Sequence, residues 1–158
     1  MPQTIQALAA ELTHFAAETI MVLVQNTPPD KWDWKPLDNG RTILNQMAEC
    51  ALANQKWADI LRRRAWVSYG EEAWQQAFSE LNTLDKAAAR LQETTANLVE
   101  AILALPDEEM DGLVQTPNGP YSLPRCCMHA YWNMVYHEGQ INYIQTLYGD
   151  FEEYEVEA

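Results

Sequence analysis

The chain has 158 residues, of which 47% are hydrophobic and only 6 are Gly. This length suits one domain that buries roughly 70% of its unfolded surface, and the composition excludes collagen-like and low-complexity proteins. Against 23 Asp and Glu stand 10 Lys and Arg, so the net charge is −13. An acidic chain repels phosphate backbones and anionic lipid, so we expect a globular domain that binds neither nucleic acid nor membrane.

Targeting and redox signals point to a cytoplasmic protein. Glu11 interrupts the N-terminal apolar segment, and the longest uninterrupted apolar run is far below the ~18 residues that span a bilayer. The three cysteines, Cys50, Cys126 and Cys127, have no spacing typical of a secreted disulfide framework. We therefore expect free thiols.

The first predicted helix covers residues 5–24. Its apolar side chains recur at steps of three and four, as one stripe of a helix does: Ile5, Leu8, Leu12, Phe15, Ala16, Thr19 and Leu23. We expect this stripe to face the core and His14, on the opposite side, to be exposed. Pro28 and Pro29 end the helix because proline removes a backbone donor.

A linker with Trp32 and Trp34 leads to a second predicted helix over residues 41–61. Tryptophans in such a connection usually cover the end of a core. Asn54 lies within the apolar stripe of this helix, and two interpretations stay open. It is either a hydrogen-bonded amide of the core or part of a wet, functional interior.

A third predicted helix covers residues 77–105, with apolar residues at alternating steps of four and three that are typical of a bundle seam. Residues 111–124 contain three Pro and two Gly and are predicted to form a loop. A fourth helix follows from about residue 124 to 148. The predicted fold is therefore all-α, a four-helix bundle over residues 1–150, with an acidic tail at 151–158.

Polar residues share one side of the fourth helix with apolar ones: His129, Asn133, His137 and Gln140. Each alone could be a hydrogen-bonded core residue, but four together need each other, water or an ion. The two histidines lie about 12 Å apart along the helix and cannot share one metal. His137 would have to pair with Asn133, and an amide is a weak ligand.

Three segments resemble the DinB/YfiT-like family of small four-helix bundles, many of which hold a divalent metal. They are the W-x-W-x-P pattern at residues 32–36, RTILNQMAECA at residues 41–51, and YHEGQINYIQTLYGD at residues 136–150. In that family helix two supplies one metal histidine, and an H-x-x-x-H-x-G-Q motif in helix four supplies two more. The resemblance places Glu49, Asn133 and His137 at these ligand positions.

Only one of the three histidines is present, so the resemblance implies a looser or altered metal site. Glu49 can ligate, but it lies on the flank of its helix stripe and could equally be a solvated carboxylate. Gln140 is the candidate for a residue that hydrogen-bonds to a metal ligand and orients it. His129 is either the group that transfers a proton to the substrate or a core histidine. Trp32 or Trp34, together with Asn54, would wall the pocket.

Two functions follow from the resemblance. One is an enzyme that uses a divalent metal (zinc, nickel or manganese) and a low-molecular-weight thiol, as an S-transferase or isomerase acting on a small molecule. The other is a noncatalytic bundle, a dimeric binding or stress-associated protein whose metal site has decayed. The family's frequent dimers and the aromatic content predict a homodimer in either case.

Overall fold

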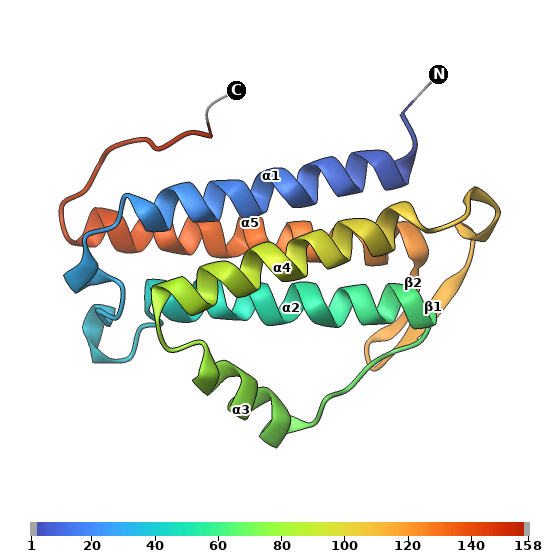
Figure 1. The fold of residues 1–158 in the computed structure, drawn as a ribbon, viewed down its shortest axis with the longest axis horizontal. Helices are drawn as coiled ribbons and strands as arrows, with labels where there is room; N and C mark the ends of the chain where they lie inside the picture. The colour runs from blue at the N-terminus through green and yellow to red at the C-terminus, as the bar shows by residue number, and fades with distance from the viewer. Residues whose placement is uncertain (1–2, 157–158) are drawn as a thin grey trace.

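The computed structural model describes residues 3–156, and its four long helices lie side by side along one axis (Figure 1). They are α1 (Ile5–Gln25), α2 (Ile43–Arg63), α4 (Leu84–Leu103) and α5 (Leu123–Leu147). The predicted all-α four-helix bundle is confirmed.

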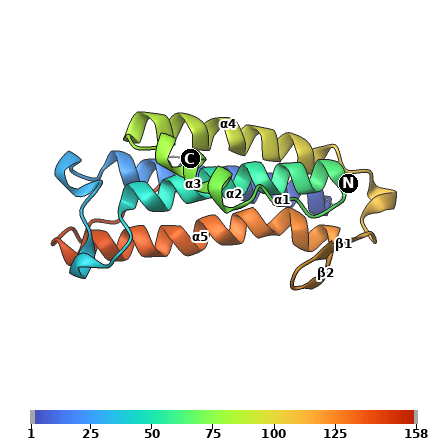
Figure 2. The same cartoon turned by 90° about the horizontal axis from the view of Figure 1, so that it is seen from below.

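The order of the helices around the bundle determines which side chains can meet. Helix α1 packs against α4 and α5, and α2 packs against the same two helices, so α1 and α2 occupy opposite corners. Helices α1 and α5 run in one direction, and α2 and α4 run in the other (Figures 1 and 2). The α2–α5 contact and the α1–α4 contact therefore lie on opposite sides of the bundle.

Each long helix begins at a hydroxyl residue that caps it. The side chains of Thr4, Thr42, Thr83 and Ser122 each accept a hydrogen bond from the backbone N–H three residues on. Such caps satisfy N–H groups that have no partner within the helix and contribute about 1 kcal/mol each. Helices α1, α2 and α5 start within two residues of the predicted positions.

The prediction of one continuous third helix is wrong. The segment forms a short helix α3 (Glu71–Glu80), a break, and then α4, whose start Thr83 caps. Helix α3 lies outside the four-helix bundle (Figure 1), and Ala77 and Leu81 are only partly buried. The apolar spacing stayed in step across the break, so the periodicity alone could not reveal it.

The predicted loop at residues 111–124 contains a β-hairpin. Strands β1 (Leu113–Thr116) and β2 (Gly119–Ser122) pair antiparallel, with Val114 opposite Tyr121. Gly119 has a φ of +99°, a conformation that glycine adopts without strain. Of the residues in these two strands, only Val114 and Tyr121 are buried. Strands of four residues with one buried side chain each show no alternating pattern in the sequence.

The buried face of α1 is only partly the predicted one, because Ala16, Thr19 and Leu23 are buried as predicted but the other members of the stripe are not. Ile5, Leu8 and Phe15 are exposed, and the core instead receives a narrow face rich in alanine: Ala9, Ala10, Thr13, Ala16, Ala17 and Ile20. Small side chains let α1 lie close to its neighbours, which a pattern of large apolar residues cannot indicate. His14 is exposed, as predicted. By length and composition α1 could also cross a membrane, and half of its most apolar stretch is buried within the bundle.

Candidate functional site

The contact between α2 and α5 brings together two of the three predicted ligands. His137 lies on the buried face of α5 with its side chain 1% exposed, and Glu49 reaches it from α2 with its side chain 29% exposed. The Oε1 atom of Glu49 lies 3.3 Å from Nε2 of His137. The structure therefore places Glu49 toward the interior and not in open solvent.

Two amide groups orient the His137 ring. Nδ1 donates to the Oε1 atoms of Gln46 and Gln140, the latter at 3.1 Å. A ring that donates from Nδ1 and is neutral carries its lone pair on Nε2. Among the residues that the structure describes, no well-aligned hydrogen bond reaches this buried Nε2, and the polar atom beside it is Oε1 of Glu49. Buried polar atoms normally have a hydrogen-bond partner within the protein. Nε2 of His137 is therefore available to bind a ligand from outside the chain.

The carboxylate of Glu49 is held ionised. A hydrogen bond between the carboxylate and the His137 ring is the main cause that lowers the pKa of Glu49 to about 2, burial opposes it, and the Arg41 guanidinium lowers it further. Arg41 pairs with Oε2 of Glu49, which leaves Oε1 facing the imidazole. At neutral pH the pair thus presents an anionic oxygen beside a ring nitrogen.

Asn133 lies one helical turn before His137 on the same wall of α5. Its Oδ1 atom is buried and has no hydrogen-bond partner among residues 3–156. Within the same range no group of three or more His, Cys, Asp or Glu side chains could hold a metal. A metal site here would consist of Glu49, His137 and an amide oxygen.

The distance between the two stronger donors fits a shared ion. Two ligand atoms that each lie about 2.1 Å from one metal are separated by about 3.0–3.4 Å at tetrahedral to octahedral angles. The observed 3.3 Å between Oε1 of Glu49 and Nε2 of His137 lies in that range. Carboxylate, imidazole and amide oxygen together suit zinc, nickel or manganese, with weaker binding than three histidines would give.

A groove of about 810 Å³ opens beside this pair. Gln46, Gln140 and Arg41, which contact His137 and Glu49, also line the groove. The rest of its wall is largely aromatic and aliphatic, with Trp34, Tyr136, Tyr143, Ile144 and Leu147. Mostly apolar walls with a few convergent polar groups are typical of sites for small molecules.

Comparison with known proteins identifies the family. The sequence profile of the DinB superfamily matches residues 6–141. The chain belongs to the DinB superfamily. No curated protein sequence matches it.

A solved structure shows the DinB fold at low sequence identity. YfiT from Bacillus subtilis has a TM-score of 0.76 to this chain at 16% sequence identity, covering 91% of this chain and 87% of YfiT. YfiT is described as "a probable metal-dependent hydrolase with an unusual four-helix bundle topology". The likeness establishes the shared fold.

The other residues singled out from the DinB resemblance take different places. Trp34 lines the groove, whereas Trp32 packs against the core and donates from Nε1 to the carbonyl of Thr27 at 2.9 Å. Asn54 is fully buried, and its Nδ2 donates to Oγ1 of Thr95 at 3.0 Å. Trp32 and Asn54 are not among the residues that line the groove.

His129 lies in an aromatic cluster of this DinB bundle, two turns from His137. Its ring stacks on Trp57 with 4.2 Å between centroids and faces Tyr121 at 6.0 Å. Burial lowers the pKa of His129, which favours the neutral ring. These contacts describe a half-buried histidine in an aromatic cluster, about 12 Å along the helix from the Glu49–His137 pair.

Gln46 is the functional residue that the sequence analysis missed. It lies one turn before Glu49 on α2, 3% exposed, and its amide oxygen fixes the His137 ring. The available signal was a glutamine at a buried position of the RTILNQMAECA segment, three residues from a candidate ligand. A polar residue there needs a partner, as Asn54 does.

Proposed function

We propose that Glu49 and His137 bind one divalent metal ion, with Asn133 as a weak third ligand. The observation that carries the proposal is the buried Nε2 of His137, which lies 3.3 Å from a carboxylate oxygen of Glu49, a separation that fits one shared cation. A lone pair facing an anionic oxygen is unfavourable unless a cation lies between them or a proton is taken up. The metal-bound form satisfies both atoms.

The residues around the pair prepare it for such a role. Gln46 and Gln140 hold the ring by Nδ1, so Nε2 is directed toward Glu49. Arg41 offsets part of the negative charge of Glu49 and keeps its Oε2 away from the ring. Trp34 and Tyr136 supply apolar surface on which a small molecule can lie next to the pair.

The reaction class that we propose is attack by an activated nucleophile on an electrophilic small molecule. A bound divalent ion lowers the pKa of a thiol or water that it holds, so that a nucleophile forms near neutral pH. A low-molecular-weight thiol would make the protein an S-transferase or isomerase. Water would make it a hydrolase, which is the description given to YfiT.

Metal titration tests the site. The protein is stripped with a chelator and titrated with Zn²⁺, Ni²⁺ or Mn²⁺ in competition with a chromophoric chelator. We expect one ion per chain, loss of binding in His137→Ala, and an affinity for zinc or nickel that rises by more than about tenfold in Asn133→His, because imidazole binds these ions better than an amide. His14→Ala, an exposed histidine elsewhere, is the matched control and should change nothing.

An unchanged affinity in Asn133→His would contradict the metal site. If the metal site is supported, a second experiment identifies the nucleophile. The metal-loaded protein is assayed for thiol conjugation of chlorodinitrobenzene and for hydrolysis of nitrophenyl acetate. Activity in one assay that disappears in His137→Ala identifies the class. Stoichiometric metal without either activity would favour a binding role.

The noncatalytic alternative is favoured by one observation, the large apolar side chains on the outer surface of α1 and α5. Ile5, Leu8 and Phe15 on α1, and Trp132 and Val135 on α5, are each 40% exposed or more. Exposed apolar residues in such number are typical of interfaces. The homodimer stays a prediction, which light scattering at micromolar concentration tests, and the cytoplasmic location stays a prediction as well. A metal-free, stable dimer would support the binding protein over the enzyme.

A further inference from the structure

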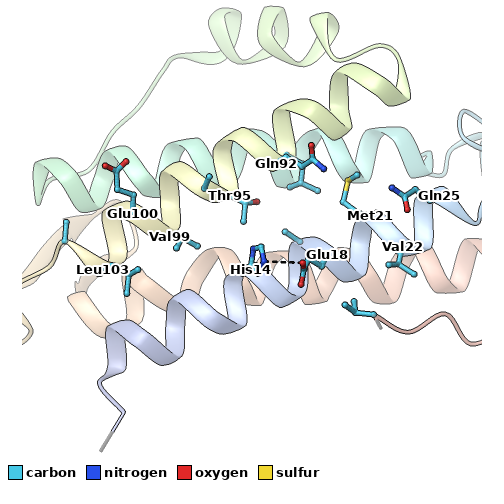
Figure 3. A pocket seen from close by; sticks show the side chains of 15 residues that line it. His14, Glu18, Met21, Val22, Gln25, Gln92, Thr95, Val99, Glu100 and Leu103 are labelled. Carbon is cyan, nitrogen blue, oxygen red and sulfur yellow. Dashed lines mark ion pairs between the residues drawn. The ribbon is translucent and has the colours of Figure 1, made fainter. Parts of the chain in front are cut away.

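A second hollow lies on the side of the bundle opposite the Glu49–His137 pair, between α1 and α4 (Figure 3). Its volume is about 950 Å³. Residues 14–25 of α1 and 91–104 of α4 contribute its lining, which at 1.5 Å per residue makes it about 17–20 Å long. The space is therefore elongated and follows the helices.

The walls of this α1–α4 groove are apolar. Met21 and Val22 come from α1, and Leu91, Val99 and Leu103 come from α4. Small residues leave the space open, since Ala17, Ala96 and Ala104 also line it. Val156 of the C-terminal tail also lines the groove. An extended hydrocarbon chain matches this shape and surface.

The charges on the groove have one sign. Its ionisable lining residues, among those the structure describes, are His14, Glu18 and Glu100, with no Lys or Arg. Glu100 is paired with Arg62 at 3.3 Å, whereas Glu18 contacts the imidazole of His14 at 3.2 Å (Figure 3). Glu18 thus carries the carboxylate that no permanent cation neutralises, on a chain with a net charge of −13.

We propose that this groove binds an elongated hydrophobic cation. The cationic head lies at Glu18 on the rim, and the alkyl chain runs from there along Met21 and Leu91. Charge complementarity selects a cation, because an anionic amphiphile with the same chain would meet an acidic rim and an acidic surface. The groove fits the volume and the apolar character of small-molecule sites. It is independent of the metal site across the bundle.

Calorimetric titration with dodecyltrimethylammonium and with laurate, both below their micellar concentrations, tests the proposal. We expect saturable binding of the cation, tighter than that of laurate by about tenfold or more. Ala96→Phe fills the groove from an exposed position and should weaken cation binding by about tenfold. Ala89→Phe is the matched control, because Ala89 is exposed on the same helix outside the groove and should leave binding unchanged.

A second pair of variants tests whether the carboxylate of Glu18 selects the cation. Glu18→Gln should remove most of the preference for the cation over laurate, whereas Glu11→Gln, an exposed carboxylate of α1 outside the groove, should keep it. Absence of saturable binding would overturn the proposal. So would equal binding of both amphiphiles, or cation binding that Ala96→Phe leaves intact. If light scattering shows that the cation binds only a dissociated chain, the groove belongs to a second copy and the proposal is also overturned.

Discussion

The α2–α5 contact and the α1–α4 contact lie on opposite sides of the bundle and differ in the polarity of their side chains. Between α2 and α5, Gln46, Glu49, His137 and Gln140 form a polar cluster in which the ring has a fixed orientation. Between α1 and α4, apolar walls enclose an elongated groove without a fixed hydrogen-bond pattern. Directional polar groups can hold an ion at one point, whereas an apolar groove recognises length and surface.

The difference follows from the residue types at each contact. A buried polar group costs about 1–3 kcal/mol without a partner, so the polar side chains at α2–α5 must arrange around one another. Alanines at α1–α4 impose no such requirement and leave space beside the packed core. The polar contact therefore restricts which chemical groups can bind there, whereas the apolar contact restricts the shape of the molecule that can bind.

The largest effect that we predict tests whether the groove is a surface hollow over a tight core. Leu91 is fully buried and forms its floor, whereas Leu103 at its end is 55% exposed. Leu91→Ala should lower the free energy of unfolding by about 2–5 kcal/mol, and Leu103→Ala by about 0.5 kcal/mol or less. Urea denaturation measures both. Similar values for the two variants would mean that the groove is not backed by packed core.

A smaller effect is expected from the polar contact alone. Gln46→Leu removes an acceptor that orients the His137 ring, and it should weaken binding of zinc or nickel about 10–100-fold. Gln92→Leu, which changes a glutamine of the α1–α4 groove, should leave metal affinity unchanged. The chelator competition assay gives both values. Equal affinity in Gln46→Leu and the unmodified protein would show that the ring needs no support from α2.

The smallest effect concerns the pH dependence of the metal-free protein. The pKa of Glu49 is about 2 in the fold and 4.5 when unperturbed, so the carboxylate stabilises the fold above about pH 5 and loses that contribution as the pH falls toward 2. Allowing for solvent screening of a partly exposed group, we expect about 1–2 kcal/mol. The difference in unfolding free energy between the unmodified protein and Glu49→Gln should shrink from pH 7 to pH 3. A difference that stays constant would contradict the assignment.

Several features could be predicted from the sequence because they depend on local chemistry. The apolar spacing and the proline stops positioned most of the long helices, and the 3.6-residue period placed Asn133, His137 and Gln140 on one face of α5. The break before α4 and the β-hairpin were missed, because the apolar spacing continued across the break and the strands were short. The pairing of Glu49 with His137 came from the resemblance, since spacing within one helix cannot name a partner on another.

The sequence by itself determined the helical periods, the caps and the residue types available for a site. Only the tertiary structure decided which face of α1 is buried, because α1 carries both a stripe of large apolar residues and a face of alanines. The alanine face lets the helices approach closely, and that gain depends on neighbours that no local pattern describes. The same holds for Gln46, whose role exists only because α2 and α5 are adjacent and antiparallel.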